Sequence, residues 1–160
     1  MSQKDVFSLA TEVVELARAK GVSLCTAESC TGGMIAEAIT SVSGASSVFL
    51  GALVTYDERM KAKWLGVREQ TLSNFGAVSA QCAAEMAQGA REASGAAVAL
   101  SVTGFAGPLG GTERDPVGTV YLCISKEGCG EVVKKRFFGT RDEVRRQAAA
   151  EALQLFLQYV

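Results

Sequence analysis

Residues 22–33 read Val22-Ser23-Leu24-Cys25-Thr26-Ala27-Glu28-Ser29-Cys30-Thr31-Gly32-Gly33, and this stretch decides the fold. Its first half, residues 22–27, is a short, mostly apolar run typical of a buried strand. Small polar residues and two glycines follow, and Met34 opens a helical apolar pattern. A buried strand that passes through a tight turn into a helix is typical of α/β folds. In open α/β sheets, ligands bind beyond the carboxyl ends of the strands.

Helices and strands alternate through the rest of the chain. Apolar spacing predicts helices that begin near Val6, Met34, Asp57, Arg68, Ser79 and Thr140. Further strands are expected over residues 48–56 and 96–103, with a loop over 104–116. A hairpin is expected from 117–125 and 131–138 around a turn at 127–130. The pattern predicts one domain over residues 1–160, a three-layer α/β/α fold with a mixed sheet.

Composition narrows the class of protein. The chain has 160 residues, 48% apolar and 21% charged, which suits one folded domain and excludes a disordered chain. Its 16 Lys and Arg against 17 Asp and Glu give a net charge of −1, so we expect no nucleic-acid partner. No apolar run approaches the roughly 18 residues of a membrane span, and no signal peptide is recognisable. We therefore expect a cytoplasmic protein with no membrane partner.

The histidine and cysteine content limits the catalytic and metal-binding sites that this chain can form. The chain has no histidine, which excludes Ser-His-Asp and Cys-His catalysis and histidine metal sites within it. Its five cysteines are odd in number and none forms a C-x-x-C pair, so we expect reduced, mostly buried thiols and no metal site. Acid–base chemistry must then rely on Lys, Tyr, Asp, Glu or Cys.

The turn at residues 29–33 is the first candidate site. Its backbone N–H groups point together at the start of a helix, which suits either a phosphate or a developing oxyanion. Ser29 and Cys30 are both candidate nucleophiles, because a helix N-terminus also lowers the pKa of a thiol. The structural alternative makes Ser29 or Thr31 a helix cap and the two glycines a requirement of packing.

Tyr56 and Lys61 form the second candidate, at a predicted junction between a strand and a helix. In a chain without histidine, lysine is the natural base for a hydroxyl nucleophile. That role requires surroundings that lower its pKa well below the ordinary value of about 10.4. The structural alternative is a lysine on a solvated helix face.

Two further segments suit an anionic ligand. The loop that contains Thr103, Gly104 and Gly107 has four glycines in eight residues, so its backbone could approach a ligand closely or simply form a surface loop. Arg141 and Arg145 are four residues apart at the start of the last helix and share a face. They suit a phosphate or carboxylate, the alternative being ion pairs with neighbouring acidic residues.

Several segments, in one order, resemble the C-terminal domain family of the competence/damage-inducible protein CinA. The resemblance spans about residues 5–157. It rests on Ala27-Glu28-Ser29-Cys30-Thr31-Gly32-Gly33, Tyr56 with Lys61, Leu65-Gly66-Val67, Gly76-Ala77-Val78-Ser79, Ser101-Val102-Thr103-Gly104, Ala106-Gly107-Pro108 and Pro116-Val117-Gly118-Thr119-Val120. It implies the family's characterised activity, hydrolysis of the carboxamide of nicotinamide mononucleotide to nicotinate mononucleotide and ammonia, in pyridine-nucleotide salvage. The chain resembles the stand-alone form, without the N-terminal domain of longer members.

The resemblance also implies roles for individual residues. Ser29 is expected to be the nucleophile, Lys61 its base and Tyr56 an assisting group, with no cofactor and no metal. Leucine at the position of Cys30 in family members argues against a catalytic thiol. The residues expected to contact the substrate are Glu28, Cys30, Thr31, Gly32, Gly33, Thr103, Gly104, Gly107, Arg141 and Arg145.

Four positions depart from the family pattern: Asp57-Glu58 stand for Ser or Thr followed by Asn, Leu109 stands for glycine and Asp115 for lysine. These departures leave open a second hypothesis, an inactive module that binds nucleotides or partner proteins in competence or DNA-damage responses. A third hypothesis is an amidase that uses Cys30. The apolar pair Phe137-Phe138 and the tail at residues 155–159 favour a homodimer, because one small core has little room for both.

Overall fold

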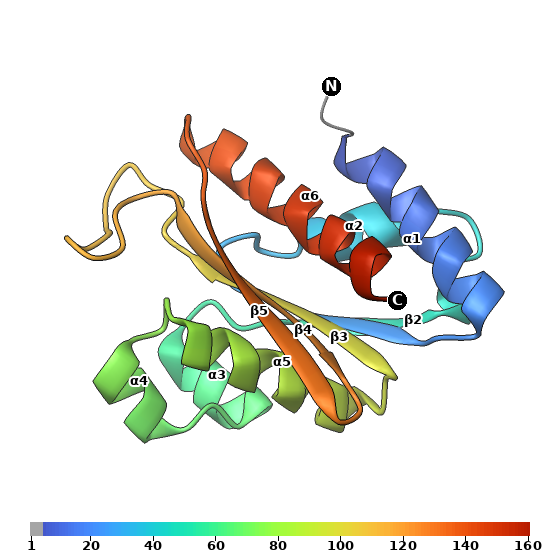
Figure 1. The fold of residues 1–160 in the computed structure, drawn as a ribbon, viewed down its shortest axis with the longest axis horizontal. Coiled ribbons are helices and arrows are strands. Elements are labelled where there is room, and N and C mark those ends of the chain that lie inside the picture. The colour runs from blue at the N-terminus through green and yellow to red at the C-terminus, as the bar shows by residue number, and fades with distance from the viewer. Residues whose placement is uncertain (1–4) are drawn as a thin grey trace.

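The computed structural model describes residues 5–160, which form a three-layer α/β/α domain (Figure 1). Its sheet has the strand order β2-β1-β3-β4-β5. The first three strands are parallel, and β4 and β5 are antiparallel to their neighbours. The strands are β1 (Leu24–Glu28), β2 (Phe49–Val54), β3 (Val98–Gly104), β4 (Thr119–Lys126) and β5 (Cys129–Arg136). The predicted fold class and mixed sheet are confirmed; residues 1–4 of the predicted domain lie outside the described residues.

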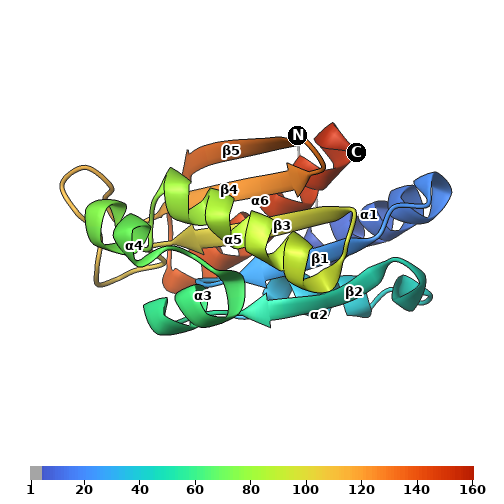
Figure 2. The same cartoon turned by 90° about the horizontal axis from the view of Figure 1, so that it is seen from below.

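Helices cover both faces of the sheet (Figures 1 and 2). One layer holds α1 (Val6–Lys20), α2 (Met34–Thr40) and α6 (Arg141–Tyr159). The other holds α3 (Glu58–Leu65), α4 (Glu69–Phe75) and α5 (Ala80–Ser94), and a short 3₁₀ turn (Ala45–Ser47) precedes β2. Within residues 5–160, no helix has the length and apolar character that a membrane crossing requires.

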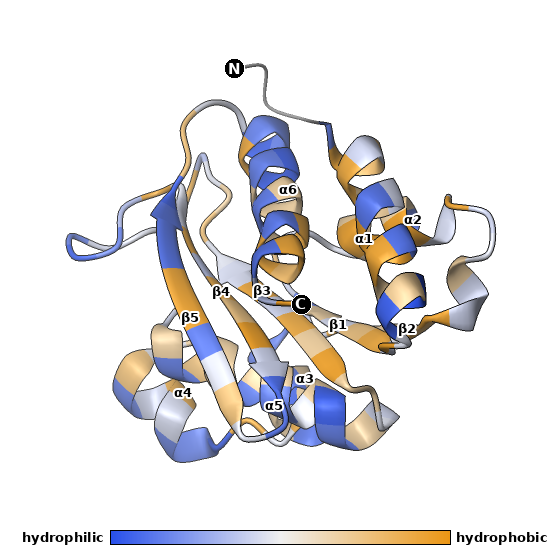
Figure 3. Ribbon diagram, turned by 45° about the vertical axis from the view of Figure 1, so that its right-hand side comes forward, coloured by the Kyte–Doolittle hydropathy of each residue, from blue (hydrophilic) through white to orange (hydrophobic). Residues whose placement is uncertain are grey.

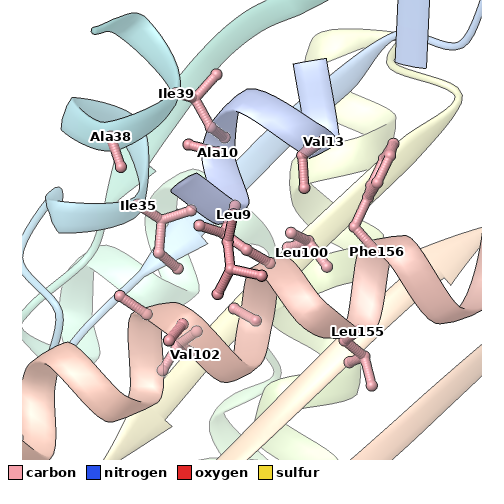
Figure 4. Packing of buried hydrophobic residues seen from close by; sticks show 14 of the residues in the cluster. Leu9, Ala10, Val13, Ile35, Ala38, Ile39, Leu100, Val102, Leu155 and Phe156 are labelled. Carbon is pink, nitrogen blue, oxygen red and sulfur yellow. The ribbon is translucent and has the colours of Figure 1, made fainter. Parts of the chain in front are cut away.

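The larger core lies between the sheet and the α1–α2–α6 layer, where Leu9, Ile35, Leu100 and Phe156 pack together (Figure 4). This packing corrects one sequence expectation. The tail is not surplus apolar surface, because Leu155 is 2% exposed and Phe156 is fully buried in this core. Leu155 and Phe156 therefore belong to the domain's own core, whereas Tyr159, the last residue of α6, is 40% exposed.

The hairpin differs from the prediction at its turn. The predicted four-residue turn is two residues long, Glu127-Gly128, and pairing begins at once between Lys126 and Cys129. Gly128 has a φ of 73°, a left-handed conformation that glycine adopts without steric cost and that closes the chain in two residues. Strand β5 also ends earlier, at Arg136, so that Phe138 lies beyond the sheet and is 70% exposed.

The packing of α3 on α5 depends on Gly89. A Cβ atom at this position would overlap the main-chain carbonyl group of Leu65 at the end of α3. We expect Gly89→Ala to lower the free energy of unfolding by about 1–3 kcal/mol, because overpacking outweighs the better helix propensity of alanine. Denaturant titration checks this against Gln88→Ala, an exposed neighbour on α5 that should change stability by less than about 0.5 kcal/mol. A stabilised Gly89→Ala protein would contradict the close approach.

Candidate active site

The turn after β1 fixes Ser29 at the carboxyl end of the parallel strands. Its N–H donates to Val102 O on β3 (3.0 Å), and its carbonyl accepts from the N–H of Gly32 (3.0 Å). Gly32 and Gly33 have φ values of 60° and 100°, so two successive left-handed residues explain the pair of glycines. Ser29 is 8% exposed and stands at the sheet edge where α/β folds bind ligands.

Lys61 reaches Ser29 from α3, in the helical layer on the face of the sheet opposite α2. It lies on α3 and is 1% exposed, and its Nζ is 2.8 Å from Ser29 Oγ. The same Nζ donates to the main-chain oxygens of Thr55 (2.5 Å) and Tyr56 (3.5 Å), in the segment that follows β2. Because β2 runs parallel to β1, with Val54 opposite Glu28, this segment lies beside the turn. The structure thus brings together two residues that are 32 positions apart.

Burial shifts the pKa of Lys61 toward the neutral amine. Removal from water lowers its pKa below the usual 10.5, and the nearby Cys82, Cys30, Glu58 and Asp57 oppose this only in part. A neutral amine has two N–H groups and one lone pair. The two carbonyl oxygens can take both N–H groups, which leaves the lone pair directed at the hydroxyl of Ser29. This arrangement is suited to removing a proton from Ser29.

The buried carboxylate of Glu28 stabilises the turn and the start of α2 by accepting hydrogen bonds. It is fully buried and accepts hydrogen bonds from Thr31 Oγ1 (2.8 Å), Ile35 N and Ala36 N (3.0 Å each), and more distantly from Thr26 Oγ1 (3.2 Å). The acceptors satisfy N–H groups that the first turn of α2 leaves without helical partners. The sequence predicts substrate contacts for Glu28 and Thr31; in the structure their side chains hydrogen-bond each other within this cap.

Arg141 and Arg145, two of the three arginines of α6, bind main-chain groups of the site. Arg145 donates from Nε to Cys30 O and from Nη2 to Thr31 O, both at 3.0 Å. Arg141 donates from Nη1 to Gly107 O (2.8 Å) and from Nη2 to the hydroxyl of Tyr56 (3.0 Å). The expected alternative, an ion pair with a neighbouring acidic residue, is also present: Asp142 lies 3.9 Å from Arg145 Nη1 and 2.7 Å from Arg146 Nε.

Tyr56 lies at the rim of the site rather than beside the amine. Its side chain is 65% exposed and its hydroxyl meets Arg141, while its main-chain carbonyl is the part near Lys61. The two hydrogen bonds of Arg141 therefore connect α6 with the segment after β2, through Tyr56, and with the glycine-rich loop, through Gly107.

Thr103 and Gly104 shape the wall beneath that loop. Thr103 is 1% exposed and its Oγ1 donates to Ala77 O (2.7 Å), before α5. A Cβ atom at Gly104 would lie 2.8 Å from Thr119 O, so only glycine lets β3 end against β4 here. The structure gives the Thr103 side chain and Gly104 internal contacts rather than exposed surface.

Cys30 is 6% exposed, packs in the larger core, and burial raises the pKa of its thiol to about 11. The thiol is therefore protonated at neutral pH, which weakens the hypothesis of a cysteine nucleophile. All five cysteines are free, and among residues 5–160 no group of His, Cys, Asp or Glu is placed to hold a metal ion.

A cavity of about 610 Å³ opens between the loop before α5, the loop over 105–116 and strands β4 and β5, and neither Ser29 nor Lys61 is among its lining residues. The sequence did not predict the residues that line this cavity. It also did not predict that Lys61 Nζ donates to the main-chain oxygen of Thr55. Main-chain acceptors have no side-chain signature. The available signal was the parallel pairing of β2 with β1, which places Thr55 beside Ser29. The residues that line the cavity include Glu58, Phe75, Ala77, Phe105, Arg114 and Tyr121.

Comparison with known proteins identifies the family. The family described as CinA C-terminal domain matches residues 6–160. A protein of Escherichia coli K12 named nicotinamide-nucleotide amidohydrolase PncC is 45% identical over 99% of this chain and 96% of its own length. A CinA-like protein of Myxococcus xanthus is also 45% identical, but this chain spans 37% of its length.

Solved structures agree over nearly the whole chain. A CinA superfamily protein from Escherichia coli has a TM-score of 0.96 at 33% identity, covering 100% of this chain and 93% of that one. A competence/damage-inducible protein from Agrobacterium tumefaciens has a TM-score of 0.94 at 39% identity, covering 97% and 95%. With the family match, these likenesses place the chain in the CinA C-terminal domain family.

Proposed function

We propose that this chain hydrolyses the carboxamide of nicotinamide mononucleotide to nicotinate mononucleotide and ammonia. The observation that carries the proposal is the 2.8 Å contact between Ser29 Oγ and the buried amine of Lys61. Support also comes from the relative named nicotinamide-nucleotide amidohydrolase, which is similar over nearly the full length of both chains. Pyridine-nucleotide salvage is the metabolic setting in which this reaction belongs.

In the proposed mechanism, Ser29 Oγ attacks the carboxamide carbon while Lys61 Nζ accepts the hydroxyl proton. The tetrahedral intermediate collapses, the C–N bond breaks, and ammonia leaves with the proton returned by Lys61. A water molecule then attacks the resulting ester of Ser29, with Lys61 again as the base. This step releases the carboxylate and restores both residues.

We assign the oxyanion of the tetrahedral intermediate to main-chain N–H groups of the turn that follows Ser29. Within residues 5–160, the main-chain N–H groups of Thr31 and Gly33 make no main-chain hydrogen bond. They adjoin the nucleophile at the start of α2, where a developing negative charge is favoured. Arg145 would stabilise the turn through its hydrogen bonds to the carbonyl groups of Cys30 and Thr31. Glu28 would stabilise it by accepting the N–H group of Ile35. Arg141 and Tyr56 would form the rim over which substrate enters.

Ammonia release from nicotinamide mononucleotide by the purified chain tests the proposal. We expect steady release with equimolar nicotinate mononucleotide and no added metal or cofactor.

The departures at Asp57, Leu109 and Asp115 favour the competing hypothesis, a nucleotide- or partner-binding module. Asp57 caps α3 through Arg59 N (2.8 Å), and Asp115 pairs with Lys134 (2.6 Å). Binding of the nucleotide by a folded protein without turnover would contradict the amidase and favour the module.

Replacing Cys30 separates the two candidate nucleophiles. We expect Cys30→Ala to keep kcat within about threefold of the unmodified protein, because the thiol is buried and protonated at neutral pH. Ammonia release is measured with Cys82→Ala, another buried thiol, as the control. Loss of more than about 100-fold in the Cys30 variant alone would restore the cysteine hypothesis.

We further propose that the protein works in the cytoplasm as a homodimer. Five free thiols suit a reducing compartment. The two sheet edges differ (Figure 3): β5 carries Lys134, Lys135 and Arg136, whereas β2 has no charge and leaves Leu50 and Val54 half-exposed. An uncharged edge strand favours pairing with another copy. A monomer in sedimentation at micromolar concentration would contradict the dimer.

A further inference from the structure

The main chain of Thr55 is hydrogen-bonded on both sides at the proposed catalytic pair. Thr55 follows β2, and its N–H donates to Glu28 O (2.9 Å), in the residue before Ser29. Its carbonyl accepts from Lys61 Nζ (2.5 Å), and the residue is 0% exposed. These two hydrogen bonds fix Thr55 beside both the nucleophile and the base.

The hydroxyl of Thr55 is buried and has no hydrogen-bond partner within residues 5–160. Side chains two residues apart on an extended strand share a face. Leu53 packs in the core cluster that contains Leu65 of α3, so the side chain of Thr55 is directed to that same layer, which also holds Lys61. An unpaired buried hydroxyl destabilises a fold, whereas a valine of the same shape carries no such cost. This hydroxyl therefore requires an explanation other than packing.

The proposed mechanism creates a need for a further acceptor at Lys61. The neutral amine has two N–H groups, which the carbonyls of Thr55 and Tyr56 can take, the second over a long 3.5 Å. Once it has taken the proton of Ser29, the ammonium has three N–H groups, while Ser29 Oγ is bonded to the acyl carbon. Between residues 5 and 160, Lys61 forms no ion pair with a carboxylate. A buried cation with too few acceptors is strongly disfavoured.

We infer that the hydroxyl of Thr55 accepts a hydrogen bond from the ammonium that forms on Lys61 during turnover. The inference rests on the proposed function and adds a positioning residue to the Ser29–Lys61 pair. The hydroxyl and carbonyl oxygens of Thr55 are joined through its own Cα and Cβ atoms, so one flexible lysine side chain can bind both. While the amine is neutral, the hydroxyl stays unpaired. Proton transfer to Lys61 supplies the N–H group that it accepts.

Thr55→Val tests the inference, because valine keeps the shape of the side chain and removes the hydroxyl. We expect kcat for ammonia release to fall by about tenfold or more, since the ammonium loses an acceptor. The pKa of Lys61 should fall by about one further unit for the same reason. It is followed by NMR of the labelled lysine amines, as the resonance that is absent from Lys61→Met. The other titratable groups that act on this amine are unchanged in the variant: Cys82 on α5, Cys30 in the turn, and Asp57 and Glu58 at the start of α3.

The stability of the variants provides a control of opposite sign. At a pH where the amine is neutral, Thr55→Val should unfold at a higher denaturant concentration than the unmodified protein, because an unpaired buried hydroxyl is removed. Thr71 on α4 is the matched control, since it is 3% exposed and its hydroxyl donates to Glu85 Oε1 (2.7 Å). Thr71→Val should unfold at a lower concentration and keep kcat within about twofold.

Thr55→Ser retains the hydroxyl and should keep both the pKa of Lys61 and, within about threefold, kcat. Three results would each overturn the inference: unchanged kcat and pKa in Thr55→Val, equal losses in Thr55→Ser and Thr55→Val, or a Thr55→Val protein that is less stable or does not fold. The NMR titration needs no substrate and so is independent of the proposed function. Absence of turnover in the unmodified chain contradicts the amidase, whereas turnover with an unchanged pKa of Lys61 in Thr55→Val contradicts only the role of the hydroxyl.

Discussion

Ser29→Ala should lower kcat for ammonia release by about 10⁴-fold or more, the loss typical when an enzyme's nucleophile is removed. The variant keeps its carbonyl and N–H contacts to Gly32 and Val102, so the turn is expected to persist. It should therefore still bind nicotinamide mononucleotide. The measurement is steady-state ammonia release together with ligand binding by calorimetry.

Ser41→Ala serves as the matched control for that loss. Ser41 follows α2 at the end away from the turn, and its hydroxyl donates to Ala38 O (2.7 Å). The control should retain nearly full activity. A Ser29→Ala protein that released ammonia at more than about a tenth of the normal rate would remove Ser29 from the chemistry.

Lys61→Met should lower kcat by about 10³-fold or more, since methionine fills a similar volume without a basic nitrogen. In the unmodified protein, kcat/KM should rise with pH through the lowered pKa of Lys61, because only the neutral amine accepts the proton of Ser29. The residual activity of Lys61→Met should lack this rise. A steep pH dependence with the same midpoint in the variant would assign it to another group.

The same lysine links stability to pH. Because burial lowers the pKa of Lys61 in the folded state, the unfolded chain binds more protons between that lowered pKa and 10.5. The free energy of unfolding of the unmodified protein should therefore rise relative to that of Lys61→Met across this window. Below the window, the full penalty of a buried charge is present. Denaturant titrations at several pH values check the sign; a difference that does not change with pH would contradict it.

The strand-turn-helix at residues 22–33 was predictable because each step has a local cause. An apolar run buries a strand, and two glycines permit the left-handed turn before α2. The pairing of Ser29 with Lys61 was not local. It depends on β2 lying beside β1, and only the family resemblance proposed it in advance.

The structure gives the polar residues around the pair contacts that the sequence did not predict. Glu28, Thr31 and Arg145 are polar residues near a candidate nucleophile, so substrate contacts were a reasonable expectation. In the structure, Glu28 and Arg145 bind main-chain groups of the turn, and the Thr31 hydroxyl donates to the Glu28 carboxylate. A polar side chain carries the same sequence signal whether it binds a ligand or a backbone N–H, and burial decides between them.

Peptide mass spectrometry of an acid-quenched single turnover shows whether Ser29 carries the acyl group. Enzyme in excess is mixed with nicotinamide mononucleotide, and the peptide that contains Ser29 and Cys30 is fragmented. We expect a nicotinate-nucleotide ester on Ser29 that appears with ammonia and decays with release of nicotinate mononucleotide. An adduct on Cys30, or stoichiometric ammonia release with the peptide unmodified at every time point, would contradict it.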